Sequence, residues 1–188
     1  SIEKVVLPNG IIAINDYAFT DCNSLSSISI PKSIKTLGNY VFSGTSINKM
    51  VIPSNIEQIK FPLGYMEKLT EIFISKSVKE IDEAFSGCVQ LRAIIVDDEN
   101  KYFSSEDGVL FNKDKTVMLR YPIAKRGNIY SVPNTVKNIY YISFYKCKYI
   151  KELHIPKSVN RIVNFVGSYS LEKIEVDEGN KYYSSLDG

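Results

Sequence analysis

Residues 25–34 read Leu25-Ser26-Ser27-Ile28-Ser29-Ile30-Pro31-Lys32-Ser33-Ile34, and this short stretch decides the fold. Isoleucine alternates with serine in it, which is typical of a β-strand that buries one face and exposes the other. Pro31 ends the strand, because proline has no amide hydrogen to give to a sheet and its ring fixes the backbone angle φ. The stretch therefore predicts a short strand followed by a corner.

The paired apolar residues of this strand recur along the whole chain. Successive pairs begin 23, 22, 22, 22, 36, 23 and 21 residues apart. A unit of about 22 residues with a single strand cannot bury its own apolar face, so such units must stack. We therefore predict a mainly β fold, a right-handed solenoid of about eight coils with short helical turns. The pairs are Val5/Leu7, Ile28/Ile30, Met50/Ile52, Ile72/Ile74, Ile94/Val96, Tyr130/Val132, Leu153/Ile155 and Ile174/Val176.

The segments between the strands follow a second pattern. After the corner, two apolar residues stand three positions apart, and a short aromatic box comes next. Three residues after the phenylalanine of each box stands a cysteine or a threonine. The box is about one helical turn long, so we expect a 3₁₀ turn or a single α turn. The boxes are Ala18-Phe19, Val41-Phe42, Ala84-Phe85 and Ser143-Phe144, and we expect displaced, irregular ones around residues 61–64 and 165–167.

The spacing of 36 residues indicates an insertion at residues 97–127, with a β-hairpin formed by residues 108–112 and 116–121. Residues 97–108 recur at 177–188 with eight of twelve positions identical. We therefore expect residues 1–188 to be a single solenoid cut from a longer array, and residues 177–188 to be a truncated second copy of the insertion motif.

The consensus of the coils, roughly L-x-x-I-x-I-P-x-S-V-x-x-I-x-x-x-A-F-x-x-C, resembles the BspA-type leucine-rich repeat of secreted and surface bacterial proteins. The resemblance covers residues 1–96 and 128–176 directly. It implies a leucine-rich-repeat solenoid, an extracellular or cell-surface location and a role in adhesion. The segment Asp-Gly-Val-Leu-Phe-Asn-Lys-Asp-Lys-Thr at 107–116 also resembles a recurrent insertion of this family.

Composition and charge exclude several classes of protein. The chain has 188 residues and a net charge of +2, from 23 Lys and Arg against 21 Asp and Glu. This balance provides no electrostatic footprint for nucleic acid. No apolar run reaches the ~18–20 residues that span a bilayer, so we expect no membrane insertion. Nucleotide-binding, nucleophile-elbow and zinc-protease motifs are missing from the sequence, so we predict no enzyme, no cofactor and no metal.

The three cysteines occupy the same position in different coils. Because coils stack at about the strand spacing of ~4.8 Å, Cys22 and Cys88 should lie roughly 14 Å apart. That separation exceeds the reach of a disulfide and of a zinc-thiolate site. We therefore interpret Cys22, Cys88 and Cys147 as buried small residues.

Three polar groups invite a chemical role. His154, the single histidine, points out of the sheet, where it could tune binding near neutral pH. Glu152 and Glu175 are diagonal neighbours at roughly 8 Å, the separation of an inverting glycosidase, but Lys173 is the direct neighbour of Glu152 and favours an ion pair. The acidic run at residues 97–100 could hold calcium, but it lacks the spacing of an EF-hand loop, which favours a solvated turn.

The outward face of three consecutive strands carries large apolar residues. Val51, Phe73 and Ile95 take the same outward position, with Ala93 and Glu71 beside them. An exposed apolar patch of this kind is typical of a surface that contacts another protein or another part of the same chain. It is either a partner-binding site or a surface that the segment 103–121 covers, and we favour the cover. The covering side chains would be Phe103, Phe111 and Tyr121.

These observations predict a noncatalytic, adhesion-type module that binds a protein partner through its sheet face. The partner would be a host or matrix protein, or another bacterial surface protein. The alternative is a structural spacer that presents another domain, and a hydrolase stands third. The predicted ligand-binding residues are Val51, Phe73, Ile95, Ala93, Glu71, Glu152 and His154.

Overall fold

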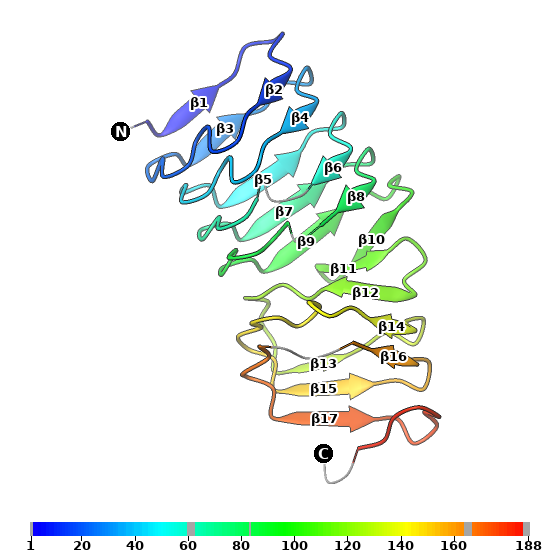
Figure 1. Ribbon diagram of the computed structural model, residues 1–188. Coiled ribbons are helices and arrows are strands. Elements are labelled where there is room, and N and C mark those ends of the chain that lie inside the picture. Colours follow the sequence, from blue (N-terminus) through cyan, green and yellow to red (C-terminus); the bar gives the residue numbers. More distant parts are fainter. Residues whose placement is uncertain (1, 60–62, 83, 164–166, 186–188) are drawn as a thin grey trace. The chain divides into compact units, whose positions relative to one another are not determined.

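A computed structural model describes residues 2–59, 63–82, 84–163 and 167–185 (Figure 1). The chain forms two compact units, Ser1–Tyr102 and Phe103–Gly188, which are described separately below. The described residues form strands and turns and no helix, so no helix among them is long and apolar enough to cross a membrane. The fold is a β-solenoid, as predicted.

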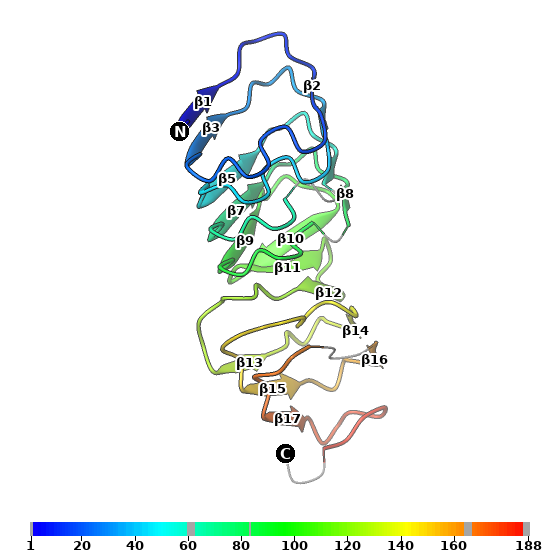
Figure 2. The ribbon, with the colours of Figure 1, turned by 60° about the vertical axis from the view of Figure 1, so that its left-hand side comes forward.

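In the first unit, each coil contributes one strand to one of two parallel ladders. Lys4 pairs with Ser27, and Lys49 pairs with Glu71, which pairs with Ala93, so that the register advances by one repeat per strand. Figure 2 shows β5, β7 and β9 stacked along one side of the unit. The strands of this line are β1 (Lys4–Val6), β3 (Ser27–Ser29), β5 (Lys49–Ile52), β7 (Glu71–Ile74) and β9 (Ala93–Val96).

Each coil then turns a corner and adds a two-residue strand to a second line. The corner is a tight turn, in which the amide of Ile34 donates to the carbonyl of Pro31 at 3.2 Å and that of Ile56 donates to Pro53 at 3.2 Å. The pairs of this second line are again parallel. They are β2 (Ala13–Ile14) with β4 (Thr36–Leu37), and β6 (Gln58–Ile59) with β8 (Glu80–Ile81).

The second unit opens with the expected hairpin. Its strands β11 and β12 pair antiparallel, β10 adds a further antiparallel strand, and β12 then pairs parallel with β14. The hairpin therefore begins one line of the coils instead of projecting from it. This sheet contains β10 (Phe103–Glu106), β11 (Val109–Asn112), β12 (Val117–Arg120), β14 (Asn138–Ile139) and β16 (Arg161–Ile162); the parallel sheet of the unit contains β13 (Ile129–Ser131), β15 (Glu152–Ile155) and β17 (Lys173–Val176).

Side chains alternate between the two faces of each strand, and those that point inward form the core of each unit. Ile72 and Ile74 of β7 are fully buried, and so is Val78 behind the corner. Complete burial of each such side chain is worth about 1.5–3 kcal/mol, which is why strands of two to four residues suffice. In the second unit the hairpin residues Phe111 and Tyr121 join the same core as Leu153 of β15.

The aromatic boxes are single turns rather than helices, each closed by a hydrogen bond such as the one from the amide of Cys88 to the carbonyl of Phe85, three residues back, at 3.2 Å. Two residues after each phenylalanine the backbone enters the left-handed region, with φ of 58° at Asp21, 70° at Gly44, 73° at Gly87 and 57° at Lys146. A left-handed residue stops a right-handed helix after one turn. The phenylalanines themselves pack inward, and Phe42, Phe85 and Phe144 are at most 4% exposed.

Of the segment expected to be irregular at residues 61–64, residues 61 and 62 lie outside the described residues. Tyr65 has a φ of 59°, so Leu63, two residues earlier, takes the place of the phenylalanine and is fully buried. The other expected irregularity falls partly on residues 164–166, which lie outside the described residues. Gly167, with a φ of 73°, marks the left-handed position of that coil.

Candidate functional site

The outward face of β5, β7 and β9 carries Val51, Phe73 and Ile95 in one column, because the parallel register pairs each directly with the next. We call these three residues the apolar strip. Val51 is 64% exposed and Ile95 is 38% exposed, and Phe73 between them is half-buried. The side chains of Val and Ile are stiff, so the strip holds its shape without a partner.

The neighbouring column on the same face is polar at one end. Lys49 Nζ lies 3.2 Å from Glu71 Oε1, and Ala93 continues the column on β9 as a small, half-buried residue. An exposed ion pair of this kind contributes at most about 1 kcal/mol to stability. It places charge of both signs beside the apolar strip.

Two of the three side chains that we expected to cover the strip, Phe111 and Tyr121, lie in the core of their own unit. Phe111 is fully buried and Tyr121 is 1% exposed, and both belong to the core of the second unit together with Met118 and Val136. Their side chains are therefore used inside their own unit. Phe103 is half-buried on β10. Among the described residues, the exposed fraction of Val51 leaves the strip accessible.

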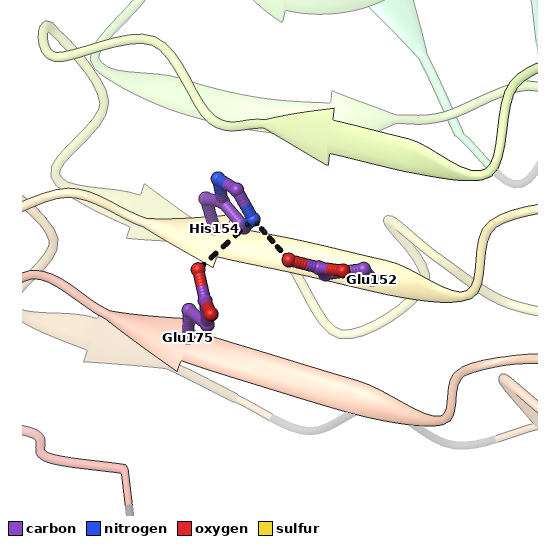
Figure 3. A group of neighbouring side chains, drawn as sticks. All are labelled: Glu152, His154 and Glu175. Atoms are coloured by element: carbon purple, nitrogen blue, oxygen red, sulfur yellow. Dashed lines mark hydrogen bonds and ion pairs between the residues drawn. The ribbon is translucent and has the colours of Figure 1, made fainter.

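In the second unit the same outward positions are polar. Glu152 and His154 lie on β15, and the register places Lys173 opposite Glu152 and Glu175 opposite His154. Figure 3 shows the imidazole of His154 between the two carboxylates. His154 Nε2 lies 2.6 Å from Glu152 Oε1 and 3.1 Å from Glu175 Oε2. We call Glu152, His154 and Glu175 the carboxylate–histidine group.

The charges of this group are balanced by Lys173. Its Nζ lies 3.6 Å from Glu152 Oε1 and also pairs closely with Glu175. The hydrogen bond with His154, with Lys173 assisting, holds the pKa of Glu152 below its usual range. The bond to Glu175 in turn raises the pKa of Lys173. Sequence spacing identified these neighbours, but not that both carboxylates turn toward one nitrogen, because that depends on side-chain rotamers.

The lowered pKa keeps Glu152 ionised near neutral pH, so this carboxyl group is unsuited to be the proton donor of a glycosidase. An open hollow of about 930 Å³ lies beside the group, lined by Ser131, Asn134, His154, Glu175 and Tyr183 among others.

The acidic run at residues 97–100 is a turn, as favoured. Asp97 accepts the amide of Glu99 at 2.9 Å, which is the local bond typical of aspartate in turns. Asn100 is fully buried, which the sequence analysis missed. Its amide donates at 2.9 Å to the carbonyls of both Ser75 and Val78 in the preceding coil.

The sequence analysis also missed a row of stacked tyrosine rings. Tyr17 and Tyr40 stack with ring centroids 5.6 Å apart, and Tyr40 and Tyr65 follow at 6.1 Å. All three residues have left-handed φ angles, between 53° and 60°. Sequence periodicity does not reveal that backbone state in residues other than glycine.

The cysteines form no disulfide among the described residues. Cys88 and Cys147 are buried as predicted, whereas Cys22 is half-buried. Cys88 Sγ donates to the carbonyl of Leu63 at 2.9 Å. Burial raises the pKa of Cys147 to about 12.

This shift predicts that native Cys147 reacts slowly with iodoacetamide. A rise from 9.0 to about 12 lowers its thiolate fraction about a thousand-fold at pH 8. The higher nucleophilicity of the thiolate offsets about half of this on a logarithmic scale, leaving an alkylation rate about thirty-fold lower than after denaturation. Peptide mapping by mass spectrometry measures the rate, with half-buried Cys22 as the internal comparison. Equal rates for native and denatured Cys147 would contradict the burial.

Coils of one short strand, a proline corner and an aromatic turn, repeated every 21 to 23 residues apart from one spacing of 36, define a leucine-rich-repeat solenoid protein. The family model described as "BspA type Leucine rich repeat region (6 copies)" matches residues 1–113 and 127–185. The chain therefore belongs to the BspA-type leucine-rich-repeat family. No curated protein matches the chain.

Three solved bacterial structures are similar in fold. A leucine-rich repeat protein from Eubacterium ventriosum is 23% identical with a TM-score of 0.72, covering 93% of this chain and 60% of its own. The pneumococcal vaccine antigen PcpA is 23% identical with a TM-score of 0.74, and the match covers 93% of this chain and 50% of PcpA. A leucine rich cell surface protein from Faecalibacterium prausnitzii is 17% identical with a TM-score of 0.55, covering 92% and 69%. The chain thus spans 60% and 50% of the first two proteins' lengths.

Proposed function

We propose that the chain is a noncatalytic, adhesion-type repeat module of a bacterial surface or secreted protein, and that its apolar strip binds a protein partner. The observation that carries the proposal is the exposure of Val51 and Ile95 in register on one ladder. Large apolar side chains that face water in a contiguous patch are typical of contact surfaces.

The ladder also favours binding for a thermodynamic reason. Ordering flexible groups on association costs about 0.5–1.5 kcal/mol for each immobilised side chain. Val51 and Ile95 are β-branched and stand on a hydrogen-bonded ladder, so little freedom remains to be lost. The charges of Lys49 and Glu71 beside the strip provide a polar rim, as protein interfaces have around an apolar centre.

The family and one neighbour support the surface location. The repeat belongs to the BspA type, and the similar protein from Faecalibacterium prausnitzii is itself described as a cell surface protein. A host or matrix protein, or another bacterial surface protein, is the partner class that this location makes accessible.

The test is a binding comparison between two sets of exposed substitutions. The chain is measured by biolayer interferometry against purified fibronectin, laminin and collagen. The variant Val51→Ser/Phe73→Ser/Ile95→Ser is expected to bind at least about ten-fold more weakly, since central apolar contacts exceed about 1.4 kcal/mol. The matched control is Val6→Ser/Ile129→Ser, which removes equally apolar residues that are 66% and 59% exposed on other coils. It is expected to bind as the original chain does.

Two results would contradict the proposal. If both variants bind as tightly as the original chain, the strip is not the contact surface. If the original chain binds none of these proteins, a host or matrix protein as the partner is contradicted. Circular dichroism spectra of all three proteins establish that the substitutions leave the fold unchanged.

A further inference from the structure

Three metal-ligating atoms from two neighbouring strands converge in the second unit. They are Glu152 Oε1, His154 Nε2 and Glu175 Oε2, and all lie within 4.8 Å of one another (Figure 3). We infer that the carboxylate–histidine group is a binding site for one divalent transition-metal ion, for which Zn²⁺ is the probe. The inference concerns another unit of the chain and does not depend on the proposed function.

The backbone places the three residues side by side on one face before any ion arrives. Glu152 and His154 are two residues apart on β15, so both side chains leave the same face of the strand. Glu175 stands directly opposite His154 on β17 in an unbroken four-residue parallel register. Sites built on strands hold their ligands more accurately than sites on loops. The arrangement therefore does not need a loop to fold around the ion.

The distances are close to those of a metal-bound state. At metal–ligand distances of 2.0–2.2 Å, ligand atoms around tetrahedral zinc lie about 3.4 Å apart. His154 Nε2 lies 2.6 Å from Glu152 Oε1 and 3.1 Å from Glu175 Oε2. Both separations reach the metal-bound value by side-chain movements smaller than 1 Å. An imidazole with two carboxylates suits Zn²⁺ and similar ions better than a site made of oxygens alone.

The second ring nitrogen of His154 has its own neighbour. His154 Nδ1 lies 3.4 Å from Ser131 Oγ on β13. When Nε2 gives its lone pair to a metal, Nδ1 carries the proton and can donate it to this hydroxyl oxygen. Metal-binding histidines commonly have such a partner, which fixes the ring and its tautomer. The side chain of His154 is 38% exposed, so water can reach the ion and fill a fourth position.

Lys173 makes the inference testable. Its ammonium group pairs with both carboxylates, so it occupies the space and supplies the charge that a metal ion would. A bound ion must displace it, and its side chain is exposed enough to move into water. Removing the lysine charge therefore strengthens metal binding, whereas removing a ligand weakens it.

The experiment titrates Zn²⁺ into the chain without a histidine tag and follows the imidazole signals by NMR. His154 is the single histidine of the chain, so its ring signals report this site alone. We expect saturable shifts at one ion per chain, with Nε2 as the bound nitrogen. Glu175→Gln is expected to lower the affinity at least about ten-fold, a loss typical of metal-site partners, and Lys173→Met to raise it several-fold. The matched control is Glu172→Gln, which removes an exposed carboxylate paired with Lys151 and should change nothing.

The inference is overturned if the experiment shows an adventitious ion only. It is indicated if Zn²⁺ binds without moving the His154 signals, as binding at Cys22 would, or if Glu175→Gln and Glu172→Gln bind equally well. If Glu175→Gln fails to fold, Lys173→Met decides, because unchanged or weaker binding in that variant also overturns the inference. The inference is also overturned if Zn²⁺ does not bind to the chain at all.

Discussion

Replacing Gly38 by alanine is expected to lower the free energy of unfolding of the first unit by about 3 kcal/mol or more. An added Cβ would lie 2.3 Å from the amide nitrogen of Asp16 and 2.6 Å from the carbonyl carbon of Asn15. These are backbone atoms, so no side-chain rotation relieves the overlap. The amide of Asn39 donates to Asp16 Oδ1 at 2.6 Å and the amide of Gly38 donates to the carbonyl of Ile14 at 2.8 Å, which holds the two coils at this separation.

The matched control for this prediction is Gly10→Ala. Gly10 has a left-handed φ of 102° and nothing within 4 Å of an added Cβ. Its substitution therefore carries conformational strain alone, about 1 kcal/mol. Urea unfolding followed by circular dichroism and tyrosine fluorescence measures both variants. If Gly38→Ala is no less stable than Gly10→Ala, the coils are not in contact at residue 38.

Replacing Asn100 by alanine is expected to cost about 3 kcal/mol, because it removes three hydrogen bonds from a fully buried side chain. The side chain is fully buried, donates to the carbonyls of Ser75 and Val78, and accepts the amide of Tyr102 at 2.8 Å. Water cannot replace these bonds at a position with no exposed surface. The loss is again measured by urea unfolding.

Asn180→Ala is the comparison for Asn100→Ala. Asn180 makes the same set of bonds, to the carbonyls of Pro156 and Val159 at 2.9 Å and from the amide of Tyr182 at 2.8 Å. It is half-buried, so water can satisfy part of what the substitution removes, and about half the cost is expected. A larger loss at Asn180 than at Asn100 would show that burial does not set the cost.

Sequence reasoning was strongest where one physical rule decides the outcome. The alternation around Ile28 and Ile30 and the proline after it determine the strand and the corner, and the spacing of the pairs determines the solenoid. The direct pairing of Glu152 with Lys173 also followed from register alone. Each of these features depends on backbone periodicity, which can be read directly from the spacing of residues in a sequence.

It failed where the outcome depends on a local backbone angle or on side-chain rotamers. The left-handed φ angles at Asp21 and Lys146, which end the turns of the aromatic boxes, were not predicted, because neither residue type announces that state. The burial of Phe111 in the core of its own unit was likewise not expected from the sequence. The convergence of Glu152 and Glu175 on one imidazole nitrogen likewise depends on rotamers.

The shared contacts of Asn100 and Asn180 have a consequence for how such a gene can change. The two asparagines stand 80 residues apart in segments that agree at eight of twelve positions, and each is hydrogen-bonded to the coil before its own. A recombination event that joined one segment to the other would add or delete a whole block while keeping the asparagine and the strand spacing. The length of the protein can therefore evolve by exchange between these segments without any new core having to be selected.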